Sequence, residues 1–472
     1  MKLLKNYIYQ FIYQFINLLV PIVTLPYITK VLGPENLGEY TYSFSIISYL
    51  ILFSDLGIKM YGSRKIAYLS DSIEEQSKVF VELFLQKFVF TIIILIGTII
   101  YFNINKYPSL YYIQSLNLIA FVLDISWFFQ GIEEFKKITI RNIISKIILI
   151  IGLFLFIKNQ TDLIRYTYLI VIINFFSNLA FWVSINKYVK IQKIKNIKIF
   201  RYIKESFEMF LPQVAISIYA LLDRVMLGYL SKKEYVTYYD VSNKLVIISM
   251  ILVTTAGGIF LPRISNLYFK NQIKEIKKLI NKTSAIFNLI AFPLMFGIIA
   301  ISDNLVDILF TSSYDNMKVL LKVMALTIIF WSWNNITGSQ ILLPTGRERK
   351  LTISVTIGAV LNIFLNYFLI KRYNALGATI ATVFTEGIVT GIQIYYSRDY
   401  FIFPVKTILK ALLSSIVMFL VIIQLKNLFL QILLGIIIYI ILLFLLKEKN
   451  VFEILQFLKD KWKDCQRKRV EK

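Results

Sequence analysis

The segment Leu18–Ser48, LLVPIVTLPYITKVLGPENLGEYTYSFSIIS, holds two apolar stretches joined by a short polar turn that contains Gly33 and Pro34. About 20 apolar residues are enough to carry a helix across the hydrocarbon core of a bilayer. Such stretches recur along nearly all of the 472 residues, of which 57% are hydrophobic, and the mean hydropathy is +0.67. The sequence therefore predicts an all-α polytopic membrane protein.

We predict about fourteen membrane helices, separated by short connections. They span approximately residues 7–29, 40–59, 80–101, 110–130, 141–157, 164–186, 207–228, 235–257, 283–301, 317–338, 351–370, 375–396, 408–425 and 428–446.

The basic residues divide unequally between the two sides of the membrane. The connections on the side of the N-terminus, together with both termini, hold 35 Lys and Arg, whereas the opposite connections hold nine. The positive-inside rule then places both termini in the cytoplasm. The net charge of +24 is explained in this way, so no nucleic-acid partner is expected.

The chain contains a weak internal repeat. Leu18–Ser48 resembles Met209–Ser249, and Gly131–Phe156 parallels Gly346–Ile370. Each pair begins on the same side of the membrane, which predicts two parallel six-helix lobes with a substrate pathway between them. The predicted domains are an N-lobe at 1–186, a basic cytoplasmic linker at 187–206, a C-lobe at 207–396, two appended helices at 397–446 and a basic cytoplasmic tail at 447–472.

The composition argues against an enzyme or a metalloprotein. The chain has no histidine and a single cysteine, Cys465, so the commonest metal ligands are scarce. No residues resemble a hydrolytic triad, and the longest outer connection has about fifteen residues, which leaves little room for a catalytic domain. We expect no metal and no cofactor. Membrane lipids are expected partners, because the basic linker suits anionic headgroups.

The first predicted helix carries a row of amide side chains. Gln10, Gln14 and Asn17 recur every three or four residues and therefore share one face of a helix. Polar residues in membrane helices often only bind neighbouring helices. The alternative is that this face lines a hydrated cavity, and the charged residues described next favour it.

Three ionisable residues lie in the inner half of the first predicted lobe. Lys87, Asp124 and Lys146 are each about two turns from the cytoplasmic end of a helix, where an isolated charge costs several kcal/mol. They are expected to form one cluster. Two cations with one obvious anion would suit an anionic ligand such as a phosphate, and an ion pair that joins helices is the alternative.

The second predicted lobe carries further charges within its helices. Asp223 and Arg224 lie in one helix, and Asp240 and Lys244 lie at matching depth in the next, so Asp can pair with Lys or Arg. Glu386 lies near the middle of helix twelve, either as a hydrogen-bonded interior carboxyl or as a site that couples transport to an ion.

Three stretches resemble the Wzx-type oligosaccharide flippases, the polysaccharide-transporter branch of the multidrug/oligosaccharidyl-lipid/polysaccharide exporter superfamily. They are Tyr27–Ala67, Trp127–Asn142 and Gln340–Glu386. The resemblance implies a two-lobed transporter with fourteen helices that moves undecaprenyl-diphosphate-linked oligosaccharide from the inner to the outer leaflet of a bacterial plasma membrane, for surface polysaccharides such as capsule and O-antigen.

The resemblance also implies a cationic central cavity, which we match by position to Lys87, Lys146, Arg224 and Lys244. Trp127, Trp331 and Trp333 are candidates for stacking on sugar rings. Other polysaccharide assembly proteins are candidate partners. The remaining alternatives are a related exporter of lipid II or of an amphipathic drug, and a membrane glycan polymerase or ligase.

Overall fold

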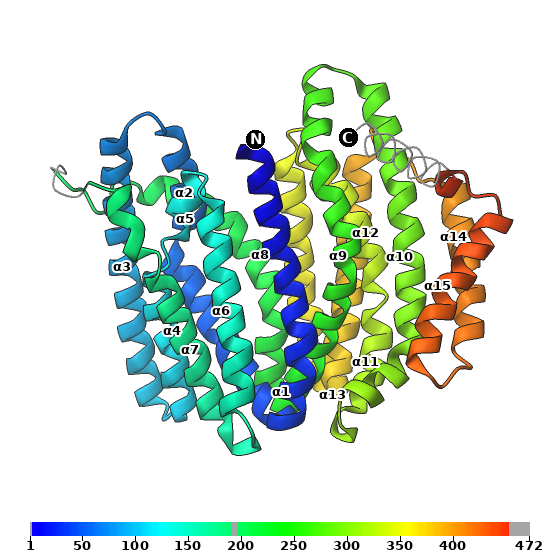
Figure 1. The fold of residues 1–472 in the computed structure, drawn as a ribbon, viewed down its shortest axis with the longest axis horizontal. Helices are drawn as coiled ribbons and strands as arrows, with labels where there is room; N and C mark the ends of the chain where they lie inside the picture. Colours follow the sequence, from blue (N-terminus) through cyan, green and yellow to red (C-terminus); the bar gives the residue numbers. More distant parts are fainter. Residues whose placement is uncertain (1, 191–195, 453–472) are drawn as a thin grey trace, which may run out of the picture. The chain divides into compact units, whose positions relative to one another are not determined.

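The computed structural model describes the backbone of residues 2–190 and 196–452, where every regular element is helical (Figure 1). Contacts divide the chain into unit 1, Met1–Thr237, and unit 2, Tyr238–Lys472. Unit 1 contains α1 (Lys2–Asp55), α2 (Ile58–Tyr68), α3 (Ile73–Ile104), α4 (Ser109–Val122), α5 (Ser126–Gly131), α6 (Phe135–Phe156), α7 (Leu163–Leu179) and α8 (Ile203–Leu230).

The helix α9 (Lys233–Phe269) begins at the end of unit 1 and continues into unit 2. Unit 2 further contains α10 (Ile273–Leu309), α11 (Asn316–Met324), α12 (Thr327–Asn334), the π-helix η5 (Asn335–Leu342), α13 (Glu348–Ser397), α14 (Val405–Ile422) and α15 (Leu428–Leu445). Short 3₁₀ turns are η1 (Gln160–Asp162), η2 (Trp182–Lys187) and η4 (Ser312–Tyr314). The boundary between the two units lies after α8, whereas the predicted lobes are separated by the linker 187–206. The lobe boundaries therefore stay a prediction.

The first two predicted helices form one element, α1, which is interrupted at Gly33. Gly33 has φ 74° and ψ 170°, a backbone conformation that a residue without a Cβ adopts at little steric cost. Pro34 follows and disfavours the α conformation at the residue before it. Figure 1 shows the turn of α1 at the lower end of the blue helix. The short turn recognised in the sequence is therefore the break between two helices.

A second interruption divides α13 at Asn374, between the predicted helices 351–370 and 375–396. Asn374 has φ 50° and ψ −128°, in the positive-φ region that Asn enters more readily than most residues. A Cβ added to Gly377 would lie 2.1 Å from the carbonyl oxygen of Leu369. The two halves of α13 thus approach each other closely at a position that only glycine permits.

The number of apolar helices agrees with the prediction. Ten helical segments of the described chain are long and apolar enough to cross a membrane. Two of these, Val20–Tyr68 and Glu348–Ser397, each hold two predicted helices. The helices α8 and α9 match the two remaining predictions, 207–228 and 235–257. The all-α polytopic fold with about fourteen membrane helices is confirmed.

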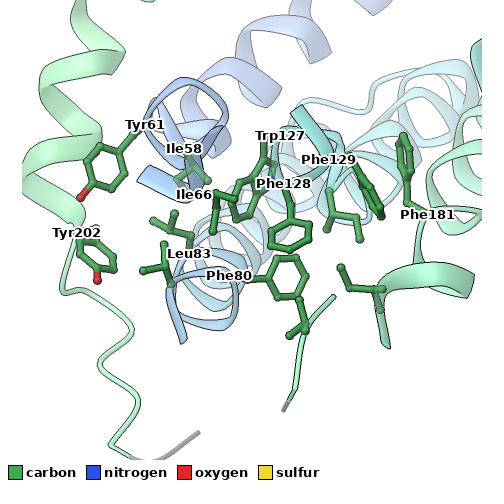
Figure 2. Close-up of a cluster of buried hydrophobic side chains, with 14 of the residues drawn as sticks. Ile58, Tyr61, Ile66, Phe80, Leu83, Trp127, Phe128, Phe129, Phe181 and Tyr202 are labelled. Carbon is green, nitrogen blue, oxygen red and sulfur yellow. The ribbon is translucent and has the colours of Figure 1, made fainter. Parts of the chain in front are cut away.

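Aromatic side chains form the core between α2, α3 and α5 in unit 1 (Figure 2). The ring centroid of Phe80 lies 5.8 Å from that of Trp127 and 5.1 Å from that of Phe128. A Cβ added to Gly62 would lie 2.5 Å from the Trp127 ring, so α2 approaches this core as closely as glycine allows. The packing fixes α3 and α5, next to the charged residues of unit 1.

Candidate functional site

Lys87 is enclosed within unit 1. Its side chain is only 1% exposed, and its ammonium group donates a hydrogen bond of 2.8 Å to the backbone carbonyl of Asp124. The same nitrogen lies 3.8 Å from the centroid of the Phe121 ring, within the range of a cation–π interaction. Lys87 therefore forms both a hydrogen bond and a cation–π interaction inside the protein.

The carbonyl that Lys87 binds is available because the predicted helix 110–130 is broken. The helix α4 ends at Val122 and α5 begins at Ser126, and a helix end leaves its last carbonyl groups without helical partners. The Asp124 carboxylate accepts a hydrogen bond of 3.0 Å from the backbone N–H of Ser126. Asp124 thus stabilises the start of α5 while its carbonyl binds Lys87.

Asp55 is a member of this cluster that the sequence analysis missed. It is 6% exposed, at the end of α1, and accepts a hydrogen bond of 3.3 Å from the backbone N–H of Lys59. Its other carboxylate oxygen is buried with no hydrogen-bond partner in the described structure. Asp55 and Asp124 are the acidic groups that act on Lys87. The prediction of one anion for Lys87 was therefore wrong.

The membership of Lys146 in this cluster stays a prediction. Lys146 lies on α6, partly buried, and the charged side chain that acts on it is Arg141 of the same helix. Arg141 donates hydrogen bonds to Ser177 at 3.2 Å and to Asn178 at 2.7 Å. Arg141 also acts electrostatically on Asp124, which links α6 to the cluster around Lys87.

Asp223 and Arg224 lie on α8 beside the second half of α1. Asp223 is 4% exposed, and both side chains act electrostatically on Tyr49 of α1. One turn further along α8, a Cβ added to Gly228 would lie 2.1 Å from the ring of Tyr42. Glycine at this position allows α8 to approach α1 closely enough to bring these charges to Tyr49.

Asp240 and Lys244 pair with each other along α9. The Lys244 ammonium lies 2.6 Å from the Asp240 carboxylate, four residues earlier in the chain. The Asp240 side chain is 4% exposed, whereas that of Lys244 is 45% exposed. Lys244 therefore keeps an open side on which a further anion can approach.

Glu386 of α13 is a hydrogen-bonded interior carboxyl, in agreement with the first of the two interpretations of the sequence. It is 4% exposed and accepts hydrogen bonds of 2.6 Å from the indole N–H of Trp331 and 2.8 Å from the amide of Asn334. The Thr390 hydroxyl, one turn further along α13, donates a hydrogen bond of 2.8 Å to the side-chain amide oxygen of Asn334. This network ties α13 to α12.

Burial excludes one of the three tryptophans from stacking on sugars, whereas Trp331 and Trp333 are partly exposed and stay candidates. Trp127 is 1% exposed in the aromatic core (Figure 2), so the suggestion that it stacks on sugars was wrong. Trp331 binds Glu386, and Trp333 donates a hydrogen bond of 3.0 Å to Asn288. The polar ends of these two rings are used to join helices.

Gln10, Gln14 and Asn17 lie on α1, but their side chains fall outside the described residues. Their exposure to a hydrated cavity stays a prediction. In a Cys465→Ser background, cysteine at each position is expected to react with a small membrane-impermeant thiol reagent, because water reaches this face. Protection of all three, with reaction at a cysteine replacing Leu19 instead, would show that the amides only bind neighbouring helices.

The described residues contain no group of three or more His, Cys, Asp or Glu that could hold a metal ion. The site residues instead form ion pairs and hydrogen-bond networks within helices that cross the membrane. Such an arrangement can hold or release an anion, or position helices during a conformational change.

Residues 3–268 match the model of the family described as polysaccharide biosynthesis protein, and residues 209–368 match the model described as MatE. The chain is 24% identical over 407 residues to a putative O-antigen transporter of Escherichia coli (strain K12), covering 84% of this chain and 97% of that protein. It is 22% identical to the capsular polysaccharide biosynthesis protein CapF of Staphylococcus aureus, over 84% of this chain and 98% of that protein.

A probable low-salt glycan biosynthesis flippase of Haloferax volcanii, Agl15, is 26% identical over 55% of this chain and 54% of its own length. Among solved structures, the lipid II flippase MurJ in an inward closed conformation superposes with a TM-score of 0.77 at 20% identity, covering 93% of this chain and 98% of that one. An outward-facing multidrug resistance MATE family transporter gives a TM-score of 0.56 at 13% identity, over 84% and 94% of the chains. At these identities the likeness establishes the fold alone.

Proposed function

Because the chain belongs to the family of polysaccharide biosynthesis proteins, we propose that it is a flippase that translocates lipid-linked oligosaccharide across a membrane. The match over residues 3–268 carries this proposal. Relatives named as an O-antigen transporter and a glycan flippase support it, and so does the multi-pass helical fold. The protein is a transporter rather than an enzyme, in keeping with those relatives.

The proposed cargo is an undecaprenyl-diphosphate-linked repeat unit, moved from the inner to the outer leaflet of a bacterial plasma membrane by alternating access. Such a molecule combines an anionic diphosphate, a hydrated glycan and a long apolar tail. Cations would hold the diphosphate, polar surface would admit the sugars, and the tail would stay in lipid. The proposed lobes, 1–186 and 207–396, would move against each other during the cycle.

Several cations are candidates for holding the diphosphate. Lys244 supports this role because almost half of its side chain is exposed although Asp240 neutralises it in part. Lys146 and Arg224 are only partly buried and stay in the proposal. Lys87 is enclosed, which supports a role in positioning α4 and α5 rather than direct contact with cargo.

The function is tested in vesicles that contain the purified protein and a fluorescent undecaprenyl-diphosphate oligosaccharide. A membrane-impermeant quencher reports the fraction of cargo in the outer leaflet. We expect rapid equilibration between leaflets with this cargo and slow equilibration with lipid II. Faster movement of lipid II would instead favour the alternative cargo, and movement of neither lipid would reject the flippase.

In the same vesicles, Lys244→Gln is expected to slow translocation about tenfold, because one charge-assisted hydrogen bond to a phosphate is lost. Lys322→Gln is the matched control, since Lys322 also forms an ion pair, with Asp303 at 2.7 Å. The control is expected to retain the original rate. Equal rates for both variants would remove Lys244 from the cargo site.

The proposed orientation places both termini in the cytoplasm. Reporter fusions after Asn36, Asn159, Ser313 and Asn427 are expected to give an outside signal, since these residues lie in the connections that are poor in Lys and Arg. A fusion after Lys270 serves as the cytoplasmic control. Cytoplasmic signals from any two of the first four fusions would contradict the proposed topology.

A further inference from the structure

Unit 2 contains a basic cavity of about 530 Å³ where α10 and α14 begin and the chain leaves α15. Four lysines line it: Lys278 and Lys282 of α10, Lys406 of α14, and Lys449 after the end of α15. None of the described residues that line it is acidic. Three segments far apart in the sequence thus bring positive charge to one hollow.

Three of the four cavity lysines have no recorded acidic partner among the residues that the structure describes. The ammonium groups of Lys278, Lys406 and Lys449 form no hydrogen bond or ion pair with any other residue that the structure describes. The nearby acid, Glu448, is 2% exposed and bonded elsewhere: it accepts from Lys410 at 3.2 Å, Thr407 at 3.0 Å and Asn450 at 2.7 Å. The cavity therefore keeps several uncompensated cations.

The pKa of the Glu448 carboxyl beside the cavity is lowered by its hydrogen-bond partners. Burial acts to raise the pKa of its carboxyl, but the hydrogen bonds from Asn450, Thr407 and Lys410 outweigh burial and hold the pKa below its usual range. Its negative charge is matched by Lys410, which does not line the cavity. Glu448 thus leaves the lysines of the cavity available to an external anion.

The first turn of α14 adds to the positive potential. This helix has 18 residues and starts at Val405 in the cavity wall, and no side chain caps its N-terminus. The unpaired N–H groups of a first helical turn favour a bound anion, above all a phosphate. Lysines and backbone N–H groups therefore converge on the same space.

An apolar strip leads away from the cavity along α14. Val405 lines the cavity and is 58% exposed, and Leu409 and Leu413 follow at 53% and 55%. Residues spaced by four lie on one helix face, so the three form a continuous strip. A phospholipid that placed its phosphate in the cavity would therefore place an acyl chain along this strip.

We propose that this cavity binds the phosphate headgroup of an anionic phospholipid, whose acyl chain lies along Val405, Leu409 and Leu413. Basic pockets among membrane helices are suited to anionic headgroups. The bound lipid joins α10, α14 and the segment after α15, because its phosphate contacts lysines from all three. The site is separate from the cargo and does not depend on which oligosaccharide is moved.

The test measures the thermal unfolding midpoint of the purified chain in a neutral detergent during titration with short-chain phosphatidylglycerol. Phosphatidylcholine of the same chain length and inorganic phosphate are titrated in parallel. We expect a saturable rise in the midpoint with phosphatidylglycerol alone. The triple variant Lys278→Gln/Lys406→Gln/Lys449→Gln is expected to bind it about 100-fold more weakly, because three favourable lysine contacts are lost.

The matched control is Lys106→Gln/Lys136→Gln/Lys158→Gln, which removes the same charge from exposed lysines of unit 1 outside the basic linker and is expected to bind phosphatidylglycerol like the original protein. Lys278→Arg/Lys406→Arg/Lys449→Arg keeps the charge and should retain binding, which guards against loss through misfolding. Equal weakening in both Gln variants would overturn the assignment. An equal rise with inorganic phosphate would assign the cavity to a soluble anion and reject the lipid.

Discussion

Lys87→Met is expected to lower the free energy of unfolding by about 1 to 3 kcal/mol, the range for leaving a buried acceptor without its donor. Lys87 is 1% exposed, and its removal leaves the Asp124 carbonyl without its hydrogen bond and the Asp55 carboxylate without its buried cation. The measurement is the thermal unfolding midpoint of the purified protein, together with its abundance in the membrane.

A second substitution separates lost charge balance from lost packing. Lys87→Met/Asp55→Asn removes the carboxylate that Lys87 no longer neutralises, so it should recover part of the stability. Lys146→Met is the control, because Lys146 is only partly buried and lies near a cation, Arg141, rather than an acid. Normal stability of Lys87→Met with loss of translocation would instead establish Lys87 as a direct cargo ligand.

Glu386→Leu is expected to cost about 2 to 6 kcal/mol, since each buried donor left without an acceptor costs about 1 to 3 kcal/mol. The two donors are the Trp331 indole and the Asn334 amide, at 2.6 and 2.8 Å from the carboxylate oxygens. Glu386→Gln keeps one acceptor oxygen and should be milder. Trp331→Phe/Glu386→Leu removes one orphaned donor and should be more stable than Glu386→Leu alone.

The same residue tests whether a carboxyl couples translocation to a proton gradient. The candidates are Glu386, Asp223 and Asp240, because the chain has no histidine. If Glu386 acts only through its hydrogen bonds, Glu386→Gln retains gradient-dependent translocation once its stability is sufficient. Loss of the gradient dependence in a stable Glu386→Gln protein would establish coupling at this carboxyl. Retention in all three amide variants would place coupling elsewhere.

Local sequence patterns predicted the helices well, since each pattern has a local cause. The length of an apolar stretch defines a membrane helix. Gly33 followed by Pro34 interrupts a helix regardless of the position of the rest of the chain. The breaks inside the predicted helices 110–130 and 317–338 were missed, because polar residues such as Asp124 also occur within helices. The Lys87 hydrogen bond that satisfies one of these breaks comes from α3, at a distance of 37 residues in the chain.

By itself, the sequence determined an all-helical membrane protein with about fourteen apolar helices and the charged residues within them. Only the tertiary structure decided their partners: Lys87 interacts electrostatically with Asp55 and Asp124, and Lys146 with Arg141. The physical reason is that depth follows from position along a helix, whereas contact depends on which helices adjoin and how each is rotated. Glycines such as Gly228 allow two helices to approach closely, because a Cβ at that position would clash with the neighbouring helix.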